Sequence, residues 1–197
     1  MDLVIASQNT HKILEIKEIF KTLFPHITLY SLYDFPEYQP VREQGASFVE
    51  NAEVKAHTAA KKLQKTCLAD DTGLVVPVLG GMEVTLQKRC AEKLSLVQQV
   101  KLLLSDLRPY KDYERAAYLE CSIAIATPAA VIRSATARSE GHIAESERGK
   151  ISCDFDTVFV KHDYSKTLAE LSSSIRSRIS CRRKACEKLV TVIENLK

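Results

Sequence analysis

Residues 67–76, with the sequence Cys-Leu-Ala-Asp-Asp-Thr-Gly-Leu-Val-Val, contain the pattern on which the fold depends. The three leading apolar residues predict a buried strand, which should end at the turn signal from Asp70 to Gly73 before a second apolar run. Two adjacent carboxylates at the end of a buried strand are costly to keep ionised unless a cation lies beside them. A divalent ion is the simplest such cation. An ordinary Asx turn before Gly73 is the alternative, and the motif alone does not decide between them.

The two aspartates are expected to have different roles. Side chains alternate along an extended backbone, so Asp70 and Asp71 should point to opposite sides of the strand. One carboxylate could then bind Mg²⁺ while the other accepts a proton from water.

A helix is predicted before this strand, over residues 47–63. Ser47 and Glu50 have the spacing of a capping box, and alanines then recur at helical spacing to form a small-residue buried face. Lys55 lies on this helix, close in sequence to the acidic strand, and is a candidate phosphate ligand. The cap explains Glu50, whereas Glu43 on the preceding loop is either a metal ligand or simply exposed.

The N-terminal residues predict a strand, a tight loop and an amphipathic helix over about residues 10–24. Ser7, Gln8, Asn9 and Thr10 form the loop, where free backbone N–H groups and the helix dipole favour a phosphate. Lys12 adds positive charge at the same place. Ordinary capping by Asn9 or Thr10, with a solvated lysine, is the alternative.

The second half of the chain mixes strands and helices without strict alternation. We expect a helix over 94–107, a half-buried strand over 117–125, a hairpin partner over 131–138 that turns at Glu140-Gly141, a strand over 156–160, a capping box at 167–170 and a C-terminal helix over 185–196. These elements predict one domain over residues 1–197, of class α/β bordering on α+β, with a central twisted mixed sheet flanked by helices.

Positive charge gathers near the start of the last predicted helix, where the helix dipole disfavours cations. The residues are Arg176, Arg178, Arg182, Arg183 and Lys184. A bound anion would relieve this repulsion. A polyphosphate fits, a solvated basic patch is the plain alternative, and nucleic acid is a third possibility.

Composition narrows the class of protein. The 28 basic and 25 acidic residues give a net charge of +3, which is too small to argue by itself for a nucleic-acid scaffold. No signal peptide or membrane-spanning stretch is found, so we expect a cytoplasmic protein. Its six cysteines are widely spaced without a CxxC pair, so they are expected to be reduced thiols, with no zinc site or disulfide framework.

In order along the chain, these segments resemble the inosine triphosphate pyrophosphatase family. Residues 5–12 (IASQNTHK) with Glu15 are similar to its opening SxNxxKxxE motif. Residues 45–52 (GASFVENA) followed by Lys55, and residues 68–74 (LADDTGL), match two further motifs. Residues 115–121 and 166–171 extend the resemblance towards the C-terminus.

The resemblance implies a role for each matching residue. It places phosphate or substrate binding on Ser7, Asn9, Lys12, Lys55 and Thr72. Metal binding falls on Asp70 and Glu43, and water activation on Asp71. The nucleobase platform falls on Phe155 and Asp156, with Arg176 and Arg182 as distal basic residues. It also implies an elongated, two-lobed fold and a homodimer.

Three segments depart from the family pattern, and all belong to its base-recognition half. The family's PGVxSARYAG-like run corresponds here to the region around residues 82–90, and its FGYDP-like run to residues 151–157. Its SHR motif is Ser180-Cys181-Arg182 in this chain. The phosphate and metal half matches throughout.

The expected function is therefore Mg²⁺-dependent hydrolysis of ITP, dITP or XTP to the monophosphate and pyrophosphate. A nucleotide-binding homologue with weak or lost turnover is one alternative, and a Maf-type pyrophosphatase with another base preference is a second. The partner is the nucleoside triphosphate substrate, and no membrane or stable nucleic-acid partner is expected.

Overall fold

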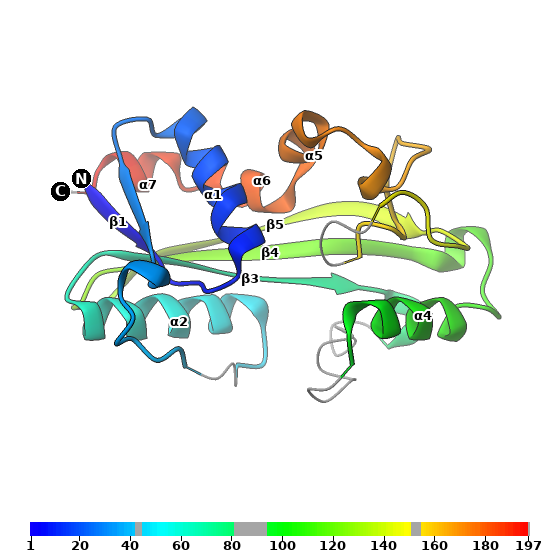
Figure 1. Cartoon of the computed structure of the whole chain (residues 1–197), viewed down its shortest axis with the longest axis horizontal. Coiled ribbons are helices and arrows are strands. Elements are labelled where there is room, and N and C mark those ends of the chain that lie inside the picture. The colour runs from blue at the N-terminus through cyan, green and yellow to red at the C-terminus, as the bar shows by residue number, and fades with distance from the viewer. Residues whose placement is uncertain (42–44, 81–93, 151–154, 197) are drawn as a thin grey trace. The chain divides into compact units, whose positions relative to one another are not determined.

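The computed structural model describes residues 1–41, 45–80, 94–150 and 155–196 (Figure 1). Six strands form one mixed sheet with the order β2-β1-β3-β4-β5-β6. Their bounds are β1 Asp2–Ile5, β2 Thr28–Ser31, β3 Cys67–Val75, β4 Ala116–Ala126, β5 Val131–Ile143 and β6 Phe159–Lys161. Strand β1 runs parallel to both β2 and β3, whereas β5 and β6 are antiparallel. The expected α/β class with a mixed sheet is confirmed.

The helices of the described chain are α1 Thr10–Leu23, α2 Phe48–Leu63, α4 Leu96–Asp106, α5 Ser173–Ile179, α6 Cys181–Glu187 and α7 Val190–Glu194. Short 3-10 turns lie at η1 Leu32–Asp34, η2 Pro77–Leu79, η3 Asp112–Arg115 and η4 Leu168–Glu170. The predicted helices over 10–24 and 94–107 are confirmed as α1 and α4. The single C-terminal helix expected over 185–196 is wrong, since α6 and α7 divide that stretch. No helix among the described residues has both the length and the apolar character needed to cross a membrane.

The chain divides into two compact units. Unit 1 comprises Met1–Thr72, Cys121–Ala137 and Ser180–Lys197, and unit 2 comprises Gly73–Glu120 and Arg138–Ile179. Each unit has its own hydrophobic core. Within unit 1, α2 covers one face of the strands, and α1, α6 and α7 cover the other (Figure 1).

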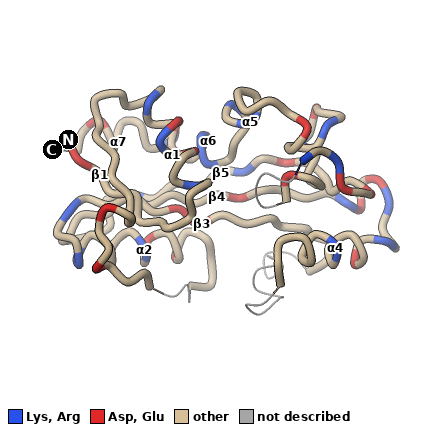
Figure 2. Tube along the Cα trace, viewed as in Figure 1, with Lys and Arg blue, Asp and Glu red and all other residues tan. Residues whose placement is uncertain are grey.

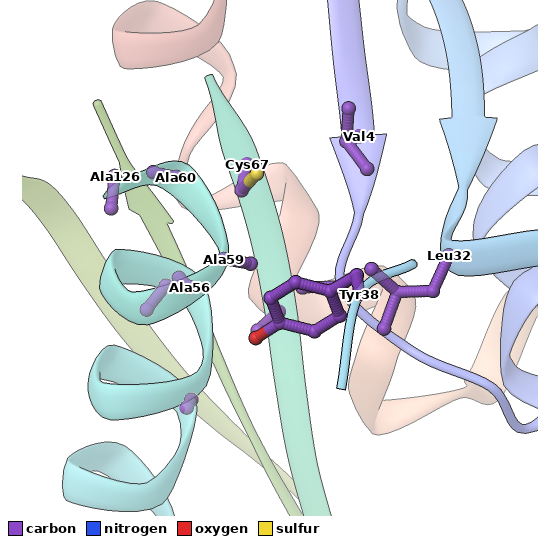
Figure 3. Close-up of a cluster of buried hydrophobic side chains, with 12 residues drawn as sticks. Val4, Leu32, Tyr38, Ala56, Ala59, Ala60, Cys67 and Ala126 are labelled. Carbon is purple, nitrogen blue, oxygen red and sulfur yellow. The ribbon is translucent and has the colours of Figure 1, made fainter. Parts of the chain in front are cut away.

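The core of unit 1 is built largely from small side chains. Ala52, Ala56, Ala59 and Ala60 of α2 are fully buried and pack with Val4, Cys67, Ala69, Ala124 and Ala126 from the sheet (Figure 3). Small residues on both surfaces allow a helix and a sheet to approach closely. The backbone of α2 is therefore held near β3, the strand that carries Asp70 and Asp71.

The cap at the start of α2 differs in part from the predicted capping box. Ser47 accepts a hydrogen bond from the backbone N–H of Glu50, as expected. The Glu50 carboxylate, however, accepts from the N–H of Ala46, at 2.7 Å. It still satisfies a free donor at the helix start, one residue earlier than a capping box requires.

The turn predicted at Glu140-Gly141 is wrong, because β5 continues through it to Ile143. Gly141 pairs with Lys161 of β6. A Cβ atom at position 141 would lie 2.1 Å from the Val160 carbonyl oxygen, so the glycine permits a close approach of two strands. The predicted strand over 156–160 is shorter and shifted, as β6.

Arg115 organises the interior of unit 2. Its guanidinium is buried and donates to the carbonyl oxygens of Ile143 at 2.8 Å, Leu107 at 2.7 Å and Ala144 at 2.7 Å. Arg115→Met keeps much of the apolar stem but leaves these buried carbonyls without their donor. We expect it to lower the free energy of unfolding by about 2–3 kcal/mol, measured by urea denaturation.

Arg108→Met is the matched control, because Arg108 is exposed and makes no ion pair within the described part of the chain. Its stability should stay within about 0.5 kcal/mol of the parent protein. Equal stability of the two variants would contradict the role given to Arg115.

Candidate active site

The acidic pair lies within a continuous strand. Strand β3 runs from Cys67 to Val75, so the turn expected from Asp70 to Gly73 is wrong, and so is its Asx-turn alternative. Asp70 contacts side chains from α1 and α6, whereas Asp71 contacts side chains from α2. The predicted alternation of the two carboxylates across the strand is confirmed. Their charges are met by cations on each face, which explains why the strand can continue through them.

One oxygen of the Asp70 carboxylate gathers several donors. Oδ2 lies 3.2 Å from Lys12 Nζ and accepts hydrogen bonds from Arg182 Nη2 at 2.9 Å and from Thr72 Oγ1 at 2.9 Å. Burial alone would raise the pKa of this carboxyl, but the charges of Arg182, Lys12 and Lys55 outweigh it and hold the pKa well below its usual range. Asp70 is therefore an anion at neutral pH.

The other oxygen, Oδ1 of Asp70, is buried and has no hydrogen-bond partner among the described residues. A buried carboxylate oxygen without a donor is unusual, and a hard cation is the ligand that such an oxygen accepts best. The described residues contain no cluster of three or more His, Cys, Asp or Glu side chains that could hold a metal. The fit is therefore to an ion such as Mg²⁺, which one or two carboxylates and substrate phosphates hold.

Asp71 is held by two residues of α2. Its Oδ1 lies 3.0 Å from Lys55 Nζ, and its Oδ2 accepts from Asn51 Nδ2 at 2.9 Å. Asn51 is itself buried, and its Oδ1 accepts from the backbone N–H of Gly45 at 2.8 Å. That bond fixes the orientation of the amide, so the Nδ2 donor must face Asp71. A Cβ atom at position 45 would lie only 2.7 Å from Asn51 Oδ1, which explains the glycine.

Arg182 connects Asp70 to helix α1. Its Nη1 forms an ion pair with Glu15, and Glu15 also accepts a hydrogen bond from the Ser180 hydroxyl. Ser180 caps α6 by accepting from the backbone N–H of Arg182 at 3.1 Å. The expectation that a bound anion relieves the charge near α6 needs revision for this arginine, because carboxylates of the chain itself surround it. Arg183 likewise pairs with Glu187, one helical turn away, at 2.9 Å, in the basic stretch at α6 that is drawn in blue in Figure 2.

The loop between β1 and α1 has the predicted cap. Asn9 Oδ1 accepts from the backbone N–H of Lys12 at 3.2 Å, and Ser7 Oγ accepts from the N–H of Asn9 at 3.1 Å. Among the described residues, no hydrogen bond uses the backbone N–H of Gln8, Thr10 or His11. These donors remain available at the positive end of α1, and the Lys12 ammonium lies nearby. Phosphate binding by this loop stays a prediction.

The predicted base platform lies in unit 2. Phe155 is 6% exposed and belongs to the core of that unit. The Asp156 carboxylate is also buried and lies 3.3 Å from Arg176 Nη1. The structure thus brings the platform residue Asp156 together with Arg176, one of the two distal basic residues. Stacking of Phe155 on a base stays a prediction.

Several expectations lie outside the described residues. They concern Glu43, the segments around 82–90 and 151–154, and two of the cysteines, Cys90 and Cys153. The other four cysteines, Cys67, Cys121, Cys181 and Cys186, are free and buried, as reduced thiols would be.

Two residues of this arrangement were not assigned a role from the sequence. Asn51 and Glu15 each appeared there only as part of a motif. Both show a signal in retrospect, since each occurs at helical spacing from a predicted ligand: Asn51 precedes Lys55 by four residues, and Glu15 follows Lys12 by three.

Known proteins resemble this chain over its full length. A model of the Ham1 family matches residues 3–192. The dITP/XTP pyrophosphatase of Protochlamydia amoebophila is 40% identical over 199 residues, covering 100% of both chains. That of Chlamydia trachomatis serovar L2 is 38% identical, covering 100% of this chain and 94% of its own length.

Solved structures agree with these matches. A HAM1 protein from Coxiella burnetii has a TM-score of 0.86 at 30% identity, and the Staphylococcus aureus Ham1 protein has a TM-score of 0.84 at 32% identity. Both comparisons cover 100% of each chain. The residues matched by the family model include every site residue described above.

Proposed function

This chain belongs to the Ham1 family, and from that membership we propose that its acidic pair carries out Mg²⁺-dependent hydrolysis of nucleoside triphosphates. The chain is a hydrolase of non-standard nucleoside triphosphates, in keeping with relatives named dITP/XTP pyrophosphatase. The proposed substrates are ITP, dITP and XTP. The proposed products are the monophosphate and pyrophosphate.

The observation that carries the proposal is the environment of Asp70. Its Oδ2 is neutralised by Arg182 and Lys12, while its buried Oδ1 lacks a hydrogen-bond donor among the described residues. The two oxygens of this carboxylate therefore have different surroundings. Oδ1 can bind a cation while Arg182 and Lys12 hold the carboxylate in place through Oδ2. Asp70 would hold Mg²⁺, and Glu43 is proposed as a second ligand. When bound, the ion would offset phosphate charge and lower the pKa of a coordinated water.

Asp71 is proposed as the general base. Lys55 and Asn51 hold its carboxylate in one orientation, and a carboxylate has about four lone-pair sites with which to accept hydrogen bonds. Asp71 would take the proton of the water that hydrolyses the anhydride bond between the α- and β-phosphates. Asp70 and Asp71 face opposite sides of β3, so Lys12 and Arg182, which neutralise Asp70, lie on the side of the strand away from the proposed base.

The phosphates would be held by the cations and free amides of unit 1. Lys12 and Lys55 each have three N–H donors, so each can contact its aspartate and a phosphate oxygen together. Ser7, Asn9 and Thr72 are proposed to add polar contacts, and Arg182 to add charge. Phe155 and Asp156 are proposed to recognise the base, and Arg176 is proposed, like Arg182, as a distal basic residue of the substrate site. A homodimer and a cytoplasmic location complete the proposal.

Pyrophosphate release tests this proposal. With Mg²⁺ present, kcat/KM for ITP, dITP and XTP should exceed that for GTP, ATP and dTTP by at least about 10²-fold, the discrimination that a pocket achieves between substrates that differ by one small group. Removing Mg²⁺ with EDTA should abolish release. Tight binding of ITP in calorimetry without any pyrophosphate release would instead identify a nucleotide-binding protein. Equal rates for all six substrates would refute the preference for non-standard purines.

A further inference from the structure

Tyr33 makes contacts that are unusual for an exposed tyrosine. Its side chain is 61% exposed, yet its hydroxyl donates to the backbone carbonyl oxygen of Gln8 at 2.7 Å. The same hydroxyl lies 3.3 Å from Thr10 Oγ1. Gln8 belongs to the loop between β1 and α1, and Thr10 is the first residue of α1. The free amide donors described above lie in the same stretch of backbone. An exposed ring thus connects η1 to a loop more than twenty residues earlier in the chain.

The topology of unit 1 brings these two segments together. Strands β1 and β2 are parallel, and Ile5 pairs with Ser31. The carboxyl ends of the two strands therefore meet at one edge of the sheet, where β1 continues into the loop and β2 continues into η1.

The turn that carries Tyr33 is itself held in place. The Asp34 carboxylate accepts from the backbone N–H of Ser31 at 2.7 Å and from its hydroxyl at 3.2 Å. Leu32 is buried in the core of unit 1 (Figure 3). Tyr30 and Phe35, which precede and follow this turn in the sequence, form an edge-to-face aromatic pair with ring centroids 6.4 Å apart. The base of the Tyr33 side chain is therefore fixed, although the ring is in solvent.

The direction of the hydrogen bonds follows from the available protons. A tyrosine hydroxyl has one proton, and the carbonyl oxygen of Gln8 can only accept it. The Thr10 hydroxyl must then be the donor to Tyr33 Oη. The chain of bonds runs from Thr10 through Tyr33 to Gln8, and it leaves the backbone N–H groups of Gln8, Thr10 and His11 unused among the described residues.

We propose that Tyr33 is a positioning residue for the triphosphate, which holds the Gln8–Thr10 backbone in the conformation that presents its N–H groups to phosphate. The inference rests on the proposed function of the same site. Tyr33 makes no contact with substrate in this mechanism. Loss of its hydroxyl leaves the loop with more conformations. The apparent affinity for the triphosphate then falls in proportion to the fraction of molecules whose loop is in the binding conformation.

Tyr33→Phe isolates this effect, because it removes only the hydroxyl. We expect KM for ITP to rise about three- to tenfold, the range that follows from loss of the hydrogen bond to the Gln8 carbonyl oxygen, since the exposed Thr10 hydroxyl can bond to water instead. The value of kcat should stay within about twofold, since Asp70 and Asp71 are untouched. Inhibition by inorganic tripolyphosphate should weaken by the same factor as KM, because the phosphates and not the base are affected.

Tyr113→Phe is the matched control. Tyr113 is 86% exposed in unit 2, and its hydroxyl makes no hydrogen bond within the described ranges. Both variants should unfold within about 2 °C of the parent protein, since neither removes buried surface. A Tyr33→Phe enzyme with unchanged KM and unchanged tripolyphosphate inhibition would overturn the proposal, as would a loss confined to kcat.

A binding measurement separates this proposal from the proposed function. The affinity of an α,β-methylene analogue of ITP can be measured by calorimetry for the parent protein and for Tyr33→Phe. If the parent protein binds the analogue but releases no pyrophosphate from ITP, hydrolysis is refuted, while weaker binding by the variant still supports the positioning role. Equal affinities would refute the role of Tyr33 whether or not the chain is active.

Discussion

Asp71→Asn should lower kcat for pyrophosphate release from ITP by about 10³-fold, within the range found for loss of a general base. The amide nearly preserves the shape of the side chain but cannot take a proton from water. It also removes the anion that faces Lys55 Nζ at 3.0 Å. Steady-state rates over a range of ITP concentrations, with Mg²⁺ held in excess, measure the effect.

Two comparisons make this result interpretable. Asp163→Asn alters an exposed aspartate that has a left-handed backbone conformation, which asparagine also tolerates, so it should leave kcat unchanged. Calorimetry should show that Asp71→Asn still binds the α,β-methylene analogue. If Asp71→Asn releases pyrophosphate at the full rate, its assignment as the base must be abandoned.

Arg182→Lys is expected to lower kcat/KM by about 10- to 100-fold, as substitutions of residues that orient a metal ligand do. The guanidinium of Arg182 contacts the Asp70 carboxylate through Nε and Nη2, at 3.1 and 2.9 Å, and contacts Glu15 through Nη1. A lysine ammonium retains the charge but cannot reproduce this planar set of donors. The same substitution should lower the free energy of unfolding by about 2 kcal/mol, because buried carboxylate contacts are lost.

Arg183→Lys provides the control at the adjacent position. Arg183 pairs with Glu187 near the surface, and a lysine can keep that i,i+4 contact, so activity and stability should remain unchanged. A further comparison combines Arg182→Lys with Glu15→Gln. Residues in direct contact give non-additive effects, so the double variant should lose less than the sum of the single losses. Full activity in Arg182→Lys would show that charge alone suffices at this position.

Local patterns along the sequence predicted much of unit 1. The helical spacing of apolar residues identified α1 to within one residue, and the alanines of α2 identified its buried face. Both elements follow from interactions between residues three or four apart, which the order of the chain displays directly. The alternation of Asp70 and Asp71 across the strand follows from strand geometry in the same way.

Non-local contacts explain the errors. Asp-Asp-Thr-Gly is a turn signal in isolation, yet the cations of α1, α2 and α6 stabilise both carboxylates within a strand. Gly141 also resembles a turn residue, but its lack of a side chain is required by a neighbouring strand. In both places the deciding partner is distant in the sequence, so composition alone pointed to the commoner local structure.

The site was predicted in part for the same reason. Motifs identified Asp70, Asp71, Lys12 and Lys55, and the structure brings each lysine to an aspartate. The sequence could not show that Arg182 would share Asp70 with Lys12, because 112 positions separate that arginine from its partner. The hydroxyl of Tyr33, 25 positions from Gln8, was hidden for the same reason.

The small-residue face of α2 also restricts how this sequence can diverge. Ala56 and Ala60 are fully buried against the sheet, and Asn51 and Lys55 of the same helix reach Asp71. A bulkier residue on this face would push the helix away from β3, and it would draw Asn51 and Lys55 away from Asp71 together. On the proposed mechanism, turnover therefore depends on alanines that are buried against the sheet and do not contact the nucleotide.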